Sequence, residues 1–173
     1  QRKKSAPRWW RWPVLVLVLI MLISVAIVLP LRWVDPPTTA FIFQDDSGRV
    51  PVLQDWTDWA SLGNAAALAV IAAEDQRFAE HFGIDIDALA DSLSDAEDGG
   101  RLRGASTITQ QLVKNLYLWP GRSFVRKGLE AWLAVIVEIC LPKRRILEIY
   151  LNVVEWGDGV FGAEAAAQRY YRV

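Results

Sequence analysis

The sequence contains one cysteine, one histidine and one methionine among its 173 residues. A single cysteine excludes an intrachain disulfide, so cysteine usage says nothing about the compartment. His81 has no second histidine or cysteine with which to form a zinc site, so we expect a hydrogen-bonding histidine and no metal-ligand set. A P-loop, a Gly-x-Ser-x-Gly elbow and a dinucleotide fingerprint are also missing. These absences argue against nucleotide-dependent, serine-hydrolase and zinc-hydrolase chemistry.

Charge is missing altogether from residues 13–31, which are mostly Val, Leu and Ile. This run of 19 residues is close to the roughly 20 that a helix needs to cross a hydrocarbon core. Indole rings favour the headgroup region, and tryptophans flank the run on both sides: Trp9, Trp10, Trp12 and Trp33. We predict a transmembrane anchor over residues 13–33. The alternative, a cleaved signal peptide, usually has an apolar region of about 7–15 residues and a small-x-small site, and residues 30–33 offer no such site.

The charges on the two sides of this run predict its orientation. Five cations and no acidic residue precede it, in a basic tail over residues 1–12: Arg2, Lys3, Lys4, Arg8 and Arg11. The positive side stays in the cytoplasm, so we predict a single-pass protein of the cytoplasmic (inner) membrane with everything after residue 33 outside, in the periplasm. The net charge of −1 includes these five cations, so residues 13–173 carry −6. An acidic remainder argues against nucleic-acid binding.

Helical periodicity and helix-ending residues predict a mainly α domain over residues 64–173. A connector with Pro36-Pro37 and a β-prone stretch at 41–43 fills residues 34–63. The predicted helices cover residues 64–82, 84–96, 107–118, 123–141 and 143–154, with another from 161 onward. Residues 116–119 and Phe124 flank a Pro-Gly break and form a candidate bilayer-dipping edge. The alternative is that these apolar residues belong to the core.

Two adjacent carboxylates, Glu74 and Asp75, follow an almost uninterrupted apolar run that begins at residue 65. Burying carboxylates beside so apolar a segment is expensive. An apolar setting favours the protonated form of a carboxyl, which suits it to exchange protons near neutral pH. This pattern predicts an acid–base site. The alternative, a helix that simply emerges into solvent at Glu74, explains the same residues.

Two further segments gather polar groups at helical spacing. Thr107, Gln110 and Lys114 are spaced to share one helix face, with Gln111 and Asn115 beside them, which suits sugar hydroxyls and phosphate oxygens. A capped surface helix is the alternative. Between residues 122 and 130 the cations Arg122, Arg126 and Lys127 precede Glu130, and such cations are common ligands of a diphosphate. An ordinary salt bridge one turn apart is the alternative there.

Taken in series, five blocks resemble the glycosyltransferase domain of the peptidoglycan polymerases, glycosyltransferase family 51. The blocks are EDQRFAEHFG (74–83), GASTITQQLVKN (104–115), RKGLE (126–130), KRRILEIYLN (143–152) and GDGVFGAEAAA (157–167). The second and fourth are long and specific, and the resemblance covers about residues 52–173. The sequence around Glu155 is more similar to that of the monofunctional biosynthetic transglycosylases than to that of the bifunctional penicillin-binding proteins. The family continues into further helices beyond Val173, so the resemblance implies a C-terminally truncated domain.

The resemblance implies a lysozyme-like α fold and the polymerisation of lipid II into β-1,4-linked glycan strands, with inversion and loss of undecaprenyl diphosphate. Glu74 matches the family's general base and Glu130 its second carboxylate, beside the leaving diphosphate. Expected contacts with substrate or diphosphate are Asp75, Ser106, Thr107, Gln110, Gln111, Lys114, Asn115, Arg122, Arg126 and Lys127. No organic cofactor is implied, although a divalent cation such as Mg²⁺ or Mn²⁺ often assists diphosphate departure. Expected partners are lipid II, the growing strand, the membrane, and proteins of wall synthesis or division.

Two other classes of function share some of these features. A lytic transglycosylase would have the lysozyme-like fold but would cleave finished glycan, typically with a single acid carboxylate. A non-catalytic scaffold for wall assembly would need only the anchor and a binding surface. The RKGLE and KRRILE blocks argue against the first, and the retained pair Glu74 and Glu130 argues against the second.

Overall fold

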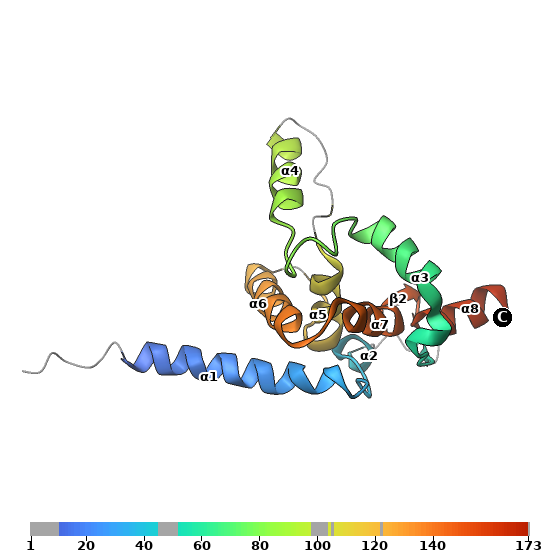
Figure 1. Cartoon of the computed structure of the whole chain (residues 1–173), viewed down its shortest axis with the longest axis horizontal. Helices are drawn as coiled ribbons and strands as arrows, with labels where there is room; N and C mark the ends of the chain where they lie inside the picture. Colours follow the sequence, from blue (N-terminus) through green and yellow to red (C-terminus); the bar gives the residue numbers. More distant parts are fainter. Residues whose placement is uncertain (1–10, 45–51, 98–103, 105, 122, 173) are drawn as a thin grey trace, which may run out of the picture.

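The computed structural model describes residues 11–44, 52–97, 104, 106–121 and 123–172, and the mainly α prediction is confirmed (Figure 1). Its helices are α1 (Arg11–Val28), α2 (Ala40–Phe43), α3 (Trp59–Glu74), α4 (Ile86–Glu97), α5 (Ile108–Tyr117), α6 (Phe124–Cys140), α7 (Lys143–Val153) and α8 (Ala163–Tyr171). A 3-10 turn, η2 (Leu29–Arg32), continues α1. The boundaries predicted for the helices that became α5, α6 and α7 agree with the structure to within one residue.

The core lies where α5 packs against α6 on one side and α7 on the other (Figure 1). Ile108 and Leu112 of α5, Val137 of α6, and Ile146 and Ile149 of α7 are completely buried. Each such side chain contributes about 1.5–3 kcal/mol through burial. The polar residues of α5, α6 and α7 are therefore held on a rigid support, which matters for the site described below.

The helix predicted over residues 64–82 begins where expected but ends too late. Helix α3 covers Trp59–Glu74 with a kink at Gly63 (φ 71°, ψ 162°), so its longer part begins at Asn64 and ends at Glu74. Asp75 leaves the helical conformation (φ −160°, ψ 75°), and its carboxylate accepts a hydrogen bond from the backbone N–H of Ile108, at 3.0 Å. This contact joins segments 33 residues apart, and no local pattern reveals it. His81 consequently lies in a turn and does not share a helix face with Glu74.

A small three-stranded sheet was not predicted. Strands β1 (Leu53–Gln54), β2 (Glu155–Gly157) and β3 (Val160–Phe161) lie in the order β1-β3-β2, with β1 parallel and β2 antiparallel to β3. Strands of two or three residues are too short to show alternation. The β-prone stretch at 41–43 is instead part of α2, which Thr39 caps by accepting a hydrogen bond from the N–H of Ile42 at 3.1 Å.

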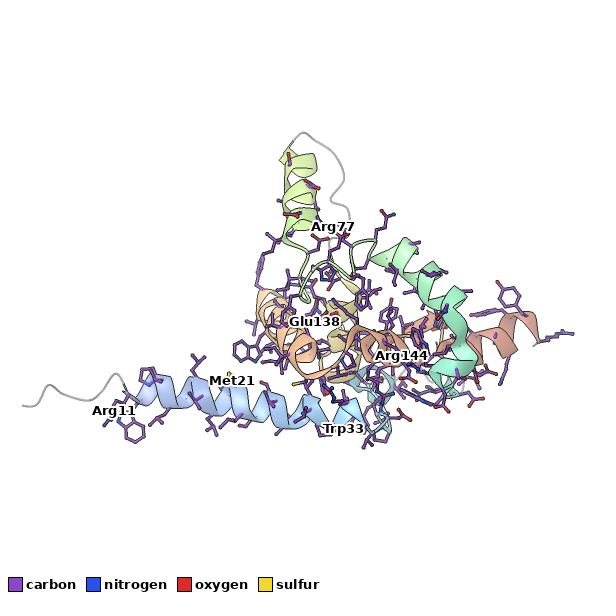
Figure 2. The ribbon with its side chains drawn as sticks, viewed as in Figure 1. Arg11, Met21, Trp33, Arg77, Glu138 and Arg144 are labelled. Carbon is purple, nitrogen blue, oxygen red and sulfur yellow. The ribbon has the colours of Figure 1, made fainter. Side chains whose placement is uncertain are left out.

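The predicted anchor helix is continuous from Arg11 to Arg32 and is the one helix of the described residues that is long and apolar enough to span a membrane. Arg11 and Trp33 mark its two ends in Figure 2. Its first half projects away from the rest of the described chain (Figure 1). Its second half packs on α6, where Nε1 of Trp132 donates to Oγ of Ser24 at 3.1 Å. Most of the predicted basic tail lies outside the described residues.

The predicted apolar edge is divided by the structure. Leu116 and Leu118 are buried in the core, so the prediction is wrong for these two residues. Trp119 and Phe124, in contrast, are 42% and 99% exposed. Phe124 begins α6, the helix that packs on the anchor. Phe124 is therefore an exposed apolar residue on the helix that packs on the predicted anchor.

Candidate active site

Glu74 is the last residue of α3 and is exposed. The apolar run before it packs Ala67 and Val70 into the core, which fixes the direction in which the end of the helix points. Oε2 of Glu74 accepts a hydrogen bond from Nε2 of Gln111, at 2.9 Å. A carboxylate at this position is accessible to a ligand and is held by one donor from α5.

Three adjoining hollows form a cleft around Glu74. The acidic hollow, of about 420 Å³, is lined by residues that include Glu74, Asp75, Arg77, Asp85 and Ser106. The cation hollow, of about 400 Å³, is lined by Phe41, Ser106, Gln111, Lys114, Asn115, Arg126, Lys127, Glu130, Val154 and Glu155. The apolar hollow, of about 390 Å³, is lined by residues that include Val70, Glu74, Gln111, Tyr150 and Trp156. Ser106, Gln111 and Glu74 each line two of the three hollows, so the hollows adjoin one another.

Glu130 is held between two cations in the cation hollow. Its side chain is 3% exposed, and Oε2 accepts from Nη1 of Arg126 at 2.6 Å while Oε1 accepts from Nζ of Lys127. Nζ of Lys127 also donates to Oγ of Ser106 at 2.9 Å. The side chain of Lys127 is about half exposed and that of Arg126 is buried, with its Nε lacking a hydrogen-bond partner among the described residues. Two cations on one buried carboxylate leave an excess positive charge at the wall of the cleft.

The polar residues of α5 do not form the single row that their spacing predicted. Thr107 and Gln110 are buried and close a capping box, in which Oε1 of Gln110 accepts from the N–H of Thr107 at 3.1 Å. Oγ1 of Thr107 donates to the carbonyl of Gly83 at 2.7 Å. These contacts begin the helix, and ligand binding by either side chain would compete with them. Gln111, Lys114 and Asn115 line the cation hollow, and Thr107 lines the acidic hollow.

Asp75 lies behind Glu74 and is buried. Both of its oxygens are 2.9 Å from Nε2 of His81, and one accepts from the N–H of Ile108. The carboxylate thus links the end of α3 to the start of α5. These contacts give Asp75 a supporting position, and direct contact with substrate stays a prediction. Arg122 lies outside the described residues.

Replacing Asp75 with asparagine should lower the free energy of unfolding by about 1–3 kcal/mol, because a buried, charge-assisted hydrogen-bond set is disturbed. Thermal unfolding measures this loss. Asp87→Asn is the matched control, since Asp87 is exposed and pairs with Arg77 at the surface, where such pairs contribute little. An unchanged unfolding temperature together with a complete loss of activity would instead place Asp75 on the substrate.

Sequence reasoning missed several residues of the cleft, among them Phe41, Tyr150 and Glu155. Tyr150 and Glu155 line the apolar hollow, and Phe41 lines the cation hollow, where Nζ of Lys114 lies 5.0 Å from the centre of its ring. Tyr150 lies within the KRRILEIYLN block, which was the available signal. Phe41 reaches the cleft only because α2 packs on α5, a tertiary contact without a local pattern.

One group among the described residues is compact enough to be tested as a cation site: Asp75, His81 and Asp85. Its carboxylates are already engaged, since Asp75 accepts from His81 and Ile108. Asp85 accepts from the N–H of Ala88 and lies 3.5 Å from Nη1 of Arg77, a cation that a metal ion would have to approach. In the cation hollow, Glu130 is likewise saturated by Arg126 and Lys127. These residues do not fit a resident divalent cation.

Comparison with known proteins then decides the family. The family model described as "Transglycosylase" matches residues 47–173. The chain belongs to the transglycosylase family. That match includes every residue of the cleft described above except Phe41.

Three curated relatives are each named biosynthetic peptidoglycan transglycosylase. The protein of Stutzerimonas stutzeri (strain A1501) is 53% identical over 86% of this chain and 64% of its own length. The protein of Shewanella frigidimarina (strain NCIMB 400) is 54% identical over 94% of this chain and 70% of its own length. The protein of Ectopseudomonas mendocina (strain ymp) is 51% identical over 91% and 68%, respectively. The chain thus spans just under two thirds of the Stutzerimonas protein.

Proposed function

We propose that this chain is a peptidoglycan glycosyltransferase that polymerises lipid II into β-1,4-linked glycan strands and releases undecaprenyl diphosphate. The observation that carries the proposal is a single cleft, in a member of the transglycosylase family, that holds both an open carboxylate and a pair of cations. Glu74 supplies the carboxylate, and Arg126 and Lys127 supply the cations. The names of the curated relatives support the same activity.

In the proposed reaction, Glu74 accepts the proton of the 4-hydroxyl on the GlcNAc unit of lipid II. The hydroxyl oxygen forms a bond to the anomeric carbon of the MurNAc unit that ends the growing strand. The bond from that carbon to the diphosphate oxygen breaks on the opposite side, so the configuration inverts. A base and a stabilised leaving group are sufficient for this displacement, and no covalent enzyme intermediate is required.

The cation hollow is suited to the departing diphosphate. Negative charge grows on the leaving oxygen as the bond breaks, and preorganised cations stabilise this charge more than that of the bound substrate. Glu130 keeps Arg126 and Lys127 in place, and the half-exposed ammonium of Lys127 is the accessible donor for a phosphate oxygen. Ser106, Gln111, Lys114 and Asn115 line the same hollow and are the proposed contacts for sugar and phosphate oxygens. Arg122, by its sequence position, belongs with them.

A polymerisation assay tests the proposal. Purified protein in detergent with fluorescent lipid II should yield glycan polymers that muramidase digests. Release of soluble fragments from finished glycan, without polymer from lipid II, would identify a lytic enzyme instead. Neither product would leave the scaffold function as the explanation.

We further propose that α1 anchors the protein in the cytoplasmic membrane, with the N-terminus in the cytoplasm and the catalytic cleft outside. The length and apolar character of Arg11–Arg32 support the anchor, and the cations before it support the orientation. A lipid-borne substrate needs an active site at the membrane surface. Because α6 packs on the outer half of α1 and also carries Glu130, the anchor would place the cation hollow close to that surface.

If the start of α6 enters the bilayer, a nitroxide attached at Phe124→Cys should be more accessible to oxygen than to a water-soluble nickel complex. A buried apolar side chain of this kind contributes about 1.5–3 kcal/mol, enough for reversible immersion and too little for permanent attachment. Paramagnetic relaxation in liposomes measures the two accessibilities.

Arg169→Cys on α8, at the far end of the molecule from the start of α1 (Figure 1), is the control and should be more accessible to the nickel complex than to oxygen. Water-like accessibility at both positions would leave α1 as the sole membrane contact. The native Cys140 is buried and should not react with the label.

A further inference from the structure

A chain of two hydrogen bonds joins a buried phenol to the exposed carboxylate of Glu74. The hydroxyl of Tyr150 donates to Oε1 of Gln111 at 2.9 Å, and Nε2 of Gln111 donates to Oε2 of Glu74 at 2.9 Å. The three residues come from α7, α5 and α3, and all three line the apolar hollow. Tyr150 is 2% exposed, so its end of the chain is fixed in the core.

The direction of this chain follows from the chemistry of its ends. Burial, together with the nearby negative charge of Glu74, raises the pKa of Tyr150, so the phenol keeps its proton and acts as a donor. A side-chain amide has one acceptor end and one donor end. The phenol therefore holds the oxygen of Gln111 toward α7 and directs its NH₂ group toward Glu74. With the amide reversed, two oxygens would face each other across the contact with Glu74.

The carboxylate of Glu74 needs a hydrogen bond that fixes its orientation. Glu74 is exposed at a helix end, and among the described residues Gln111 is its one side-chain hydrogen-bond partner. A general base works well only when its oxygen is held within hydrogen-bond reach of the proton that it removes. With Oε2 occupied by Gln111, Oε1 remains for the substrate hydroxyl. The orientation of Glu74 is thus set through Gln111 by Tyr150, which does not itself contact Glu74.

We propose that Tyr150 is a positioning residue that acts through Gln111 to orient Glu74 as the base, a role that rests on the proposed glycosyltransferase activity. The hydroxyl of Tyr150 does not exchange protons in the reaction. The proton leaves the sugar hydroxyl and binds Oε1 of Glu74, and the Gln111 amide keeps both of its hydrogen bonds.

The test is a double-mutant cycle in lipid II polymerisation. Tyr150→Phe removes one oxygen and should lower kcat roughly tenfold, about the value of one hydrogen bond, with little change in KM. Gln111→Met removes both ends of the link and should lower kcat by at least as much. The double variant should be no slower than Gln111→Met alone, because Tyr150 acts only through Gln111. Tyr117→Phe, on the anchor side of the core, should keep the wild-type kcat.

Three results would overturn the role of Tyr150: a wild-type kcat in Tyr150→Phe, losses that multiply in the double variant, or a loss confined to KM. The last two would place the phenol on the substrate. If Tyr150→Phe does not fold, as judged by thermal unfolding, Gln111→Met carries the test alone, and an unchanged kcat in that variant would overturn the proposal. A wild-type protein that makes no polymer would instead overturn the proposed function, so the two failures are distinct.

Discussion

Glu74→Gln should lower the rate of lipid II polymerisation by roughly two to four orders of magnitude, the usual contribution of a general base. Glutamine keeps the size of the side chain but replaces the carboxylate that accepts the proton with an amide, which is not a base. Because Glu74 is exposed and lies at a helix end, the change should leave the fold intact. Initial rates with fluorescent lipid II measure the effect, and binding of lipid II to the variant should persist.

Glu164→Gln on α8 is the matched control, since it makes the same chemical change outside the three hollows. It should keep the wild-type rate and the wild-type unfolding temperature. A folded Glu74→Gln protein with a rate close to wild type would remove Glu74 from the role of base. Asp75→Asn, whose carboxylate supports the helix junction, should reduce the rate less than Glu74→Gln does.

The parts of the fold that could be predicted are those with local signals. The start of α5 follows from a capping box between Thr107 and Gln110, and α6 ends just before Pro142. The end of α3 could not be predicted, because Asp75 leaves the helix to meet Ile108, which is 33 residues away. A periodic pattern continues through this point in the sequence, but the non-local hydrogen bonds override it.

The same distinction applies to the cleft. Glu74, Lys127 and Glu130 were recognisable because their blocks resemble a family and their side chains carry charge. Tyr150 was not, because an aromatic residue in an apolar helix is usually a core residue, and its hydroxyl acquires a purpose only through Gln111 on another helix. For Gln110 the sequence allowed either a place in the polar row or a helix cap, and the structure shows the cap, in which its amide oxygen accepts from the N–H of Thr107.

Lys127→Ala should lower kcat by about 10²–10³, the usual cost of removing one preorganised group that stabilises charge in the transition state. Lys127 is the best member of the cation hollow to test. Its side chain is 46% exposed, so removing it should barely affect folding. Arg126 and Glu130 are buried, and breaking their pair would cost about 3–5 kcal/mol of stability and confuse the kinetic result.

The division of the Lys127→Ala effect between kcat and KM identifies the role of this cation. Charge on the diphosphate grows as the bond to the sugar breaks, so a lysine that stabilises departure affects kcat, and Lys127→Arg should recover part of the rate by keeping the charge. Arg144→Ala on α7 changes the net charge equally, but Arg144 lies over the ring of Trp59 and lines none of the three hollows. This control should polymerise at the wild-type rate. A raised KM with an unchanged kcat in Lys127→Ala would mean that Lys127 holds the ground-state substrate, and stabilisation of the leaving group would then fall to Arg126.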